Sequence, residues 1–142
     1  MKTFICKTVE DTINAGKKLG ESLKKGMTAV LSGTLGAGKT IFVKGIALSL
    51  GIIENITSPS FTIMSVYKGK FKLYHIDLYR IESEEELEYL GITDTIYKDG
   101  ISVIEWGERA RDILPENTIY ITIEIVKNNC RKIEISNIDV LK

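Results

Sequence analysis

The spacing of apolar residues along the chain predicts alternating helices and strands. An amphipathic stretch follows Thr8 and predicts a helix over 9–24, which Thr8 and Asp11 are placed to cap. Residues 28–31 form a short, continuous apolar run, as expected for a strand covered on both faces. Helical spacing returns over 39–50. The first third of the chain therefore predicts the order helix, strand, helix.

The rest of the chain predicts mainly strands. Segments rich in β-forming residues at 61–67 and 71–77 are separated by a polar turn, which indicates a hairpin. Ser83 precedes a short helical stretch over 84–90. Further strands are expected at 101–104, which is mostly apolar, at 119–126, where apolar and polar residues alternate, and at 131–136, which returns antiparallel to it.

The composition indicates one compact domain that spans residues 1–142. Lys and Arg together number 19, as do Asp and Glu, and this zero net charge does not favour direct binding to DNA or RNA phosphates. No apolar run is long enough for a membrane span, and Lys7 interrupts the apolar N-terminus too early for a signal peptide, so we expect a cytoplasmic protein. Cys6 and Cys130 lack metal-ligand spacing and are expected to be free thiols.

A glycine-rich segment between the first predicted strand and the helix at 39–50 has the most specific chemical pattern. Residues 33–40 read Gly-Thr-Leu-Gly-Ala-Gly-Lys-Thr, which matches the phosphate-binding P-loop pattern G-x-x-x-x-G-K-[ST] in full. A strand before it and a helix after it are the context that this pattern requires. We therefore predict an α/β fold of the P-loop NTPase type, with three α/β/α layers and a mostly parallel central sheet that carries antiparallel hairpins.

Each residue type in this loop has a chemical reason. Glycines let the backbone curl so that successive N–H groups point at anionic oxygens, which a Cβ would obstruct. Lys39 is expected to reach the β- and γ-phosphates, and the Thr40 hydroxyl to join the shell of a bridging Mg²⁺. The backbone cradle is expected to consist of Gly33, Gly36, Ala37 and Gly38.

Hydrolysis also needs acidic residues near the metal and a group that orients water. Glu105 ends the predicted strand at 101–104 and is the stronger candidate for the metal, because a buried strand beside the P-loop strand would present it there. Asp77 ends another strand and is expected in a metal or water role, with a turn aspartate as the alternative. Thr62, in the hydroxyl-rich segment 58–62, is a weaker candidate for a residue that responds to the γ-phosphate.

The nucleotide expected is ATP, because the chain has no Asn-Lys-x-Asp element for reading guanine. Three activities stay open: an ATPase, a small-molecule kinase that works without a protein partner, and an adaptor that binds a partner only with ATP and releases no phosphate. The four arginines, at 80, 109, 111 and 131, are not clustered in the manner of a kinase lid, which weakens the kinase hypothesis.

Three further features have open interpretations. Trp106 is expected either in the core or near the nucleotide or a partner. Five acidic residues between 82 and 88 are typical of a solvated helix face, with a docking patch as the alternative. His75 is the only histidine and is interpreted as a polar strand residue without a role in proton transfer.

Five segments, taken in order, resemble those of the TsaE (YjeE) family. They are the P-loop at 33–40, Ser-Pro-Ser-Phe-Thr at 58–62, His-Ile-Asp-Leu-Tyr-Arg at 75–80, Glu-Leu at 86–87 with a glycine at 91, and Ile-Glu-Trp at 104–106. The resemblance extends from Thr8 to about Ile135, and this combination is far more specific than the P-loop by itself.

The resemblance implies a cytoplasmic bacterial ATPase that works with the TsaD and TsaB proteins. That system makes threonylcarbamoyladenosine beside the anticodon of tRNAs that read codons beginning with A. A TsaE-like protein is expected to dock at the TsaD–TsaB pair, to contact tRNA only through that complex, and to reset the pair by ATP hydrolysis that is slow in the isolated protein. By the same resemblance, Lys39 and Thr40 hold phosphates and Mg²⁺, Glu105 is the metal-side acid, and Thr62 and Asp77 are switch residues.

The family also places two outlying residues beside the nucleotide, one near the start of the first helix and one late arginine. In this chain Thr8 or Val9, and Arg131, occupy those places. Ile41 stands where the family usually has a threonine, so its backbone N–H, and no side-chain hydroxyl, is expected to face the α-phosphate. An Asn-Cys pair at 129–130 replaces the usual glycine-containing turn, which leaves the geometry of that turn open.

Overall fold

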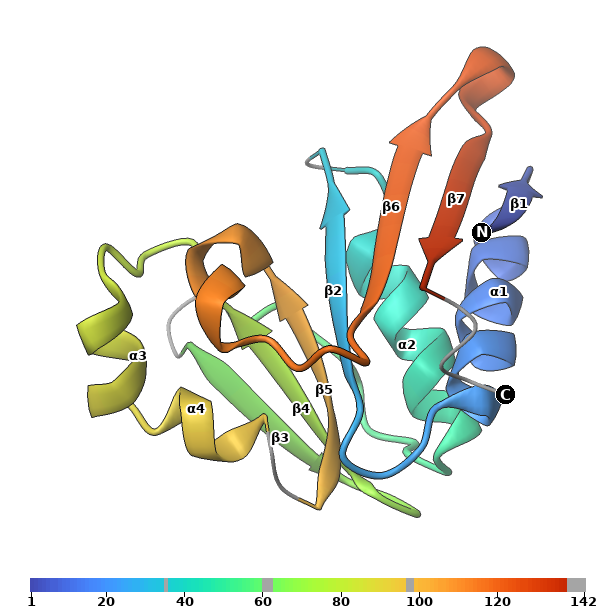
Figure 1. The fold of residues 1–142 in the computed structure, drawn as a ribbon. Helices are drawn as coiled ribbons and strands as arrows, with labels where there is room; N and C mark the ends of the chain where they lie inside the picture. Colours follow the sequence, from blue (N-terminus) through green and yellow to red (C-terminus); the bar gives the residue numbers. More distant parts are fainter. Residues whose placement is uncertain (35, 60–62, 97–98, 138–142) are drawn as a thin grey trace.

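The computed structural model describes residues 1–34, 36–59, 63–96 and 99–137, which form a seven-stranded sheet with helices on both faces (Figure 1). In chain order the elements are β1 (Lys2–Cys6), α1 (Val9–Ser22), β2 (Thr28–Gly33), α2 (Lys39–Ser49), β3 (Met64–Lys68), β4 (Lys72–Asp77), α3 (Glu84–Tyr89), α4 (Ile92–Thr95), β5 (Gly100–Glu105), η1 (Gly107–Ile113), β6 (Ile119–Ile125), η2 (Lys127–Asn129) and β7 (Arg131–Ser136). No helix in these ranges is long and apolar enough to cross a membrane.

The strands are arranged in the order β1-β7-β6-β2-β5-β4-β3. The four central strands, β6, β2, β5 and β4, run parallel to one another, while β3 and the β7–β1 pair are antiparallel additions at the two edges. This confirms the predicted α/β fold, with a mostly parallel centre and antiparallel hairpins. The carboxyl ends of β2, β5 and β4 therefore meet at one edge of the sheet, which is where ligands bind in open parallel sheets.

Helices α1 and α2 cover one face of the sheet and are in backbone contact with each other. Thr8 and Asp11 form the predicted capping box at the start of α1, with hydrogen bonds of 3.0 and 3.2 Å. A Cβ at Gly16 would lie 2.2 Å from the carbonyl oxygen of Phe42, and one at Gly45 would lie 2.1 Å from that of Ile13. Because α2 begins at the glycine-rich loop, this close contact helps to hold the loop at the sheet.

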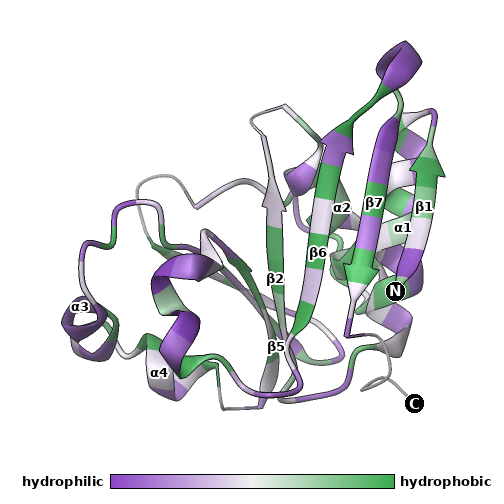
Figure 2. Cartoon of the chain, turned by 45° about the horizontal axis from the view of Figure 1, so that its top comes forward, coloured by the Kyte–Doolittle hydropathy of each residue, from purple (hydrophilic) through white to green (hydrophobic). Residues whose placement is uncertain are grey.

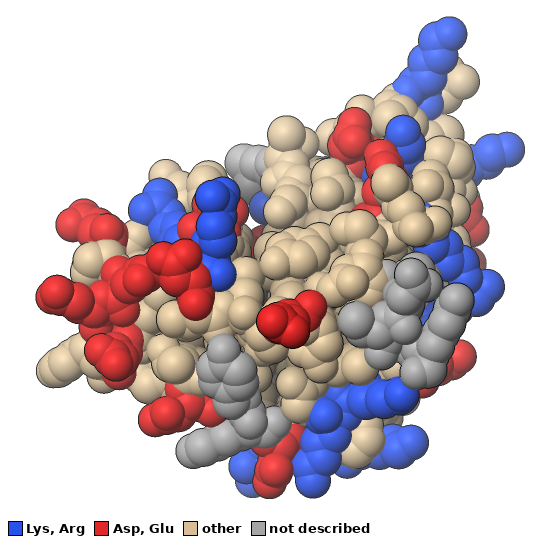
Figure 3. Space-filling view, viewed as in Figure 1, with Lys and Arg blue, Asp and Glu red and all other residues tan. Residues whose placement is uncertain are grey.

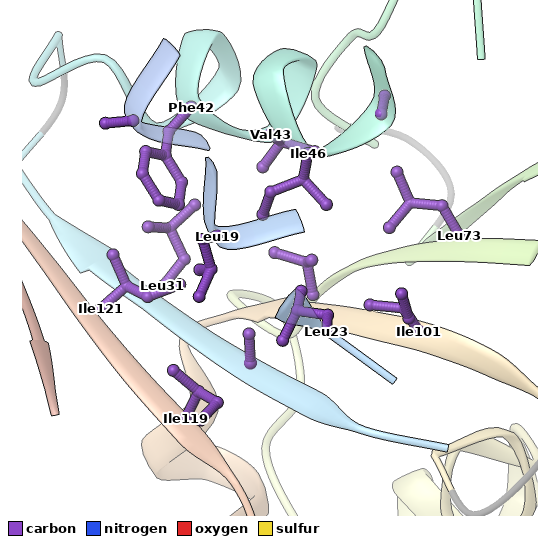
Figure 4. Packing of buried hydrophobic residues seen from close by; sticks show 14 of the residues in the cluster. Leu19, Leu23, Leu31, Phe42, Val43, Ile46, Leu73, Ile101, Ile119 and Ile121 are labelled. Carbon is purple, nitrogen blue, oxygen red and sulfur yellow. The ribbon is translucent and has the colours of Figure 1, made fainter. Parts of the chain in front are cut away.

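The larger hydrophobic core lies between these two helices and the sheet (Figure 4). Phe42, Val43 and Ile46 of α2 point at strand residues such as Leu31 and Ile121, and all of them are buried. Complete burial of a side chain of this size stabilises the fold by about 1.5–3 kcal/mol, so this core holds α2, which begins at the loop, firmly on the sheet.

Shorter helices cover only part of the opposite face. A smaller core packs Leu87 of α3 and Ile92 of α4 against Ile76 and Ile104 of the sheet. Over β6 the same face is exposed at Tyr120, Thr122 and Glu124, so this strand alternates between hydrophobic and hydrophilic residues (Figure 2).

Most predicted elements are confirmed, and four short elements were missed. Strand β7 has the predicted bounds. Gly51 and Gly91 have a left-handed backbone, which is common just after the end of a helix. Strand β3 starts at Met64, and residues 61 and 62 of the predicted strand lie outside the described ranges. The sequence analysis missed β1, α4, η1 and η2, because a five-residue edge strand, a four-residue helix and two 3₁₀-helices give too little periodicity to detect.

Cys6 and Cys130 are both free thiols, as expected. Cys6 is buried, while Cys130 is partly exposed in the connection between β6 and β7. Burial raises the pKa of the Cys6 thiol, which keeps it in the unreactive protonated form at neutral pH.

Candidate functional site

The glycine-rich loop connects β2 to α2, as the P-loop pattern requires. Gly36 and Gly38 have positive φ angles of 80° and 106°, which favour glycine. Gly33 is required for a different reason, because a Cβ there would lie 2.7 Å from the carbonyl oxygen of Ile123 on β6. No described side chain caps the start of α2, so the N–H groups of its first turn are available to an anion.

Lys39, the first residue of α2, turns back over this loop. Its ammonium donates a 2.9 Å hydrogen bond to the carbonyl oxygen of Gly33 and lies 3.4 Å from Oε1 of Glu105. Thr40 follows it, half-buried in the same first turn. The lysine and hydroxyl predicted to face phosphates and metal therefore lie at the mouth of the loop.

Glu105 reaches this position because β5 is the neighbour of β2 in the sheet. Leu31 of β2 pairs in register with Glu105, so the acid lies beside the end of the P-loop strand, as predicted. Its second carboxylate oxygen, Oε2, is 2.9 Å from Nε2 of His75 on β4. Lys39 of α2, Glu105 of β5 and His75 of β4 thus form a continuous row of polar contacts. The row lies on the side of the sheet that α1 and α2 cover.

The two inner members of this row, Glu105 and His75, are buried. Only 6% of Glu105 and none of His75 is exposed. Burial by itself would raise the pKa of the Glu105 carboxyl, but the hydrogen bond and charge interactions with His75, followed by those with Lys39, hold that pKa below its usual value. The site therefore presents a carboxylate anion at neutral pH.

Asp77 lies at the same edge, in register with Glu105. Its Oδ1 accepts a 3.0 Å hydrogen bond from the N–H of Tyr79, which makes it a turn aspartate as well as a strand-end acid. Its own N–H donates to the carbonyl oxygen of Ile63 at 2.8 Å. The turn at Asp77 is thus tied to the start of β3. Thr62 lies outside the described residues, as do the two residues before it.

A cavity of about 220 Å³ opens beside the loop. Its walls come from the end of β1, the start of α1, the glycine loop, α2 and the β6–β7 turn. The lining residues are Cys6, Lys7, Thr8, Val9, Thr12, Gly36, Ala37, Gly38, Ile41, Asn129 and Arg131. The structure therefore brings the predicted residues Thr8, Val9, Ile41 and Arg131, which lie far apart in the chain, together around one cavity.

Arg131 does more than line this cavity, because its guanidinium is bonded to the loop itself. Nε donates to the carbonyl oxygen of Ala37 at 2.9 Å, Nη2 to that of Gly36 at 3.3 Å, and Nη1 to that of Asn129 at 2.8 Å. Asn128 and Asn129 have left-handed backbones, with φ of 60° and 57°. Asparagine tolerates this conformation, so it replaces glycine in the turn that positions Arg131.

Trp106 follows Glu105 directly and is 39% exposed, so the core interpretation of this residue is wrong. Its ring lies 4.9 Å from that of Tyr79, and the guanidinium of Arg109 lies 5.8 Å from the Trp106 ring. The aromatic pair is a surface feature next to the strand ends of the site. Glu82, Glu84, Glu85 and Glu88 are exposed around α3, where acidic side chains gather in Figure 3, and this exposure is compatible with both a solvated helix face and a docking patch.

The sequence analysis did not recognise that His75 belongs to this site. Two signals pointed to it: a polar side chain inside an apolar strand must find a partner, and the period of two places His75 on the same face as Asp77. The partner was not predictable, because it comes from a different strand.

Comparisons with known proteins agree on one family. The family model for "Threonylcarbamoyl adenosine biosynthesis protein TsaE" matches residues 6–133. The chain is 44% identical over 132 residues to the tRNA threonylcarbamoyladenosine biosynthesis protein TsaE of Treponema pallidum, an alignment that covers 93% of this chain and 98% of that protein. It is 38% identical over 136 residues to the TsaE of Bacillus subtilis, which covers 94% and 85% of the two chains.

A solved structure gives the same result. The crystal structure of YdiB from Bacillus subtilis superposes with a TM-score of 0.76 at 31% sequence identity, and the match covers 93% of this chain and 82% of that one. Because the family model covers most of the chain and the relatives align over nearly all of it, the chain belongs to the TsaE family of tRNA threonylcarbamoyladenosine biosynthesis proteins.

Proposed function

We propose that this chain binds ATP with Mg²⁺ and hydrolyses it, as the ATPase component of tRNA threonylcarbamoyladenosine biosynthesis. The observation that carries the proposal is the 3.4 Å approach of the Glu105 carboxylate to the ammonium of Lys39 at the mouth of the glycine loop. A P-loop lysine and a strand-end acid at one sheet edge are the pair that P-loop NTPases use for phosphates and metal. The names of the related proteins support the pathway.

The residues around the loop fit a nucleoside triphosphate. The N–H groups of the glycine loop and of the first turn of α2 suit the phosphate oxygens. The cavity beside the loop lies where a nucleoside attached to those phosphates would extend, and Val9 and Ile41 give it an apolar wall for a base. Upon binding, Lys39 would exchange its contacts with Gly33 and Glu105 for the β- and γ-phosphates.

The residues also fit a Mg²⁺ ion that is coordinated jointly by the protein and by the phosphates. The described residues hold no group of three or more His, Cys, Asp or Glu side chains placed to bind a metal ion. Mg²⁺ is commonly held by one or two protein oxygens together with phosphates and water, and Thr40 and Glu105 supply such oxygens. When bound, Mg²⁺ would neutralise charge on the phosphates during phosphoryl transfer.

Hydrolysis would be communicated through the segment 58–62 and the turn at Asp77. The hydrogen bond from Asp77 to Ile63 ties that turn to the residue after the segment, so the two can respond together to the γ-phosphate. In this proposal Thr62 and Asp77 are the switch residues. The surface they alter would be the one offered to the TsaD and TsaB proteins, with tRNA contacted only through that complex.

Phosphate release by the purified protein at fixed MgATP, with and without the TsaD–TsaB pair, tests this proposal. We expect slow release alone and faster release with the pair. Lys39→Ala should weaken nucleotide binding, whereas Glu105→Gln should affect binding less and abolish turnover. Equal losses of binding and turnover in both variants would contradict these separate roles.

The same experiment separates the alternatives. Transfer of labelled phosphate to a small molecule without any partner would indicate a kinase. Binding of the pair only with ATP, without phosphate release, would indicate an adaptor.

A further inference from the structure

His75 occupies a position where an apolar residue would be expected. It lies in the middle of β4, is fully buried, and neighbours Leu73 and Ile76, which belong to the two hydrophobic cores. Burying an imidazole next to a carboxylate costs desolvation that an apolar side chain of similar volume would avoid. The contact with Glu105 is therefore the feature of His75 that calls for a physical explanation.

The hydrogen bond between the two residues has a defined direction. The Glu105 carboxylate can only accept, so Nε2 of His75 is the donor in either protonation state of the ring. Nδ1, the other ring nitrogen, has no hydrogen-bond partner among the described residues. Among the residues that the structure describes, Glu105 is thus the one polar contact of the His75 side chain.

The two carboxylate oxygens of Glu105 contact different partners. Oε2 is held by His75 at 2.9 Å, while Oε1 lies 3.4 Å from Lys39. If Lys39 turned to a phosphate, the His75 hydrogen bond would be the remaining one of these two contacts. It would then keep Oε1 directed at the glycine loop.

We propose that His75 is a positioning residue, whose Nε2–H holds the Glu105 carboxylate so that Oε1 faces the metal and phosphate site. The proposal rests on the proposed function in taking Glu105 as the metal-side acid. It assigns His75 no contact with nucleotide or metal, so its effect should appear in the steps that depend on Glu105. Loss of a hydrogen bond that orients a metal ligand typically costs about 10–100-fold in metal affinity or activity.

A matched pair of variants isolates the hydrogen bond from charge and volume. His75→Gln keeps an N–H donor near the position of Nε2, whereas His75→Leu fills similar space without a donor, and neither carries a charge. We expect His75→Leu to reduce kcat for ATP hydrolysis by about 10-fold or more while the affinity for ADP in EDTA changes by less than about 2-fold. His75→Gln should recover most of the kcat. His75→Met serves as a second apolar variant should the leucine variant fail to fold.

A readout independent of turnover is the gain in ADP affinity when Mg²⁺ replaces EDTA. This gain should shrink in His75→Leu and be retained in His75→Gln. An unchanged kcat and Mg²⁺ gain in the apolar variants would overturn the proposal, as would a glutamine variant no better than the apolar ones. A wild-type protein that binds MgADP but releases no phosphate would instead overturn the proposed ATPase function, and the Mg²⁺ gain would still decide the role of His75.

Discussion

The two faces of the sheet differ in how their helices are held and in what they carry. On one face, α1 and α2 touch through their backbones at Gly16 and Gly45. Glu105 and His75 lie on this face of the sheet, and Lys39 approaches Glu105 from the start of α2. On the other face, the short helices α3, α4 and η1 pack on a smaller core beside an exposed aromatic pair. The phosphate site that we propose is made of backbone N–H groups and needs a backbone held in place, which the tightly packed face provides.

The largest expected effect is on the contact between α1 and α2. Gly45→Ala would place a Cβ 2.1 Å from the carbonyl oxygen of Ile13, so the helices must separate. We expect a loss of about 3–4 kcal/mol in the free energy of unfolding, measured by urea denaturation. Gly91→Ala on the other face is the matched control. No atom lies within 4 Å of its Cβ position, and its positive φ alone should cost about 1 kcal/mol. Equal losses would show that backbone contact does not distinguish the two faces.

The second prediction tests whether the faces act separately. Leu87→Ala removes a buried side chain from the smaller core and should cost about 2–3 kcal/mol in stability. Nucleotide affinity, measured by calorimetry at a temperature where the variant is folded, should stay within about 2-fold of the wild type because the site faces the other helices. Leu19→Ala, the matched change on α1, should lower both quantities. A large loss of affinity in Leu87→Ala would contradict the separation.

The third prediction concerns the tie between the loop and the β6–β7 turn. Arg131→Lys cannot reproduce the three hydrogen bonds that the guanidinium makes to backbone carbonyl oxygens, so the loop should be less well held. We expect the affinity for ADP to fall by about 3–10-fold, or about 1 kcal/mol, with little change in unfolding free energy. Arg111→Lys, an exposed change on η1, is the control and should have no effect. Unchanged affinity in Arg131→Lys would show that the loop holds its shape without the guanidinium.

The smallest expected effect is on how the free energy of unfolding changes at acidic pH. The folded chain holds the pKa of Glu105 below the value of 4.5 that the unfolded chain has. Its contribution to stability is therefore fully present above that pH and is lost as the pH falls through the folded pKa. Glu105→Gln removes this contribution, so its unfolding free energy should fall less steeply with decreasing pH in that range. The same dependence of the unfolding free energy on acidic pH in the wild type and in Glu105→Gln would contradict the lowered pKa.

Much of the site was predictable because it is local in the chain. The P-loop pattern, the strand before it and the helix after it lie within about 25 residues, and the left-handed glycines follow from the loop itself. Glu105 and Asp77 were predictable as strand-end acids for the same reason. Short elements such as α4 and η1 were not, since a few residues show no reliable periodicity.

The sequence by itself determined the glycine-rich loop, its lysine and threonine, and the α/β class, because local backbone preferences and apolar periodicity specify these features. Only the tertiary structure decided that Glu105 meets Lys39, that His75 holds the other oxygen of that carboxylate, and that Arg131 clamps the loop. These contacts join residues that are far apart in the chain: His75 and Glu105 are separated by 30 positions, and Ala37 and Arg131 by 94. They depend on strand order and register, which arise from the packing of the whole sheet and cannot be derived from any single segment.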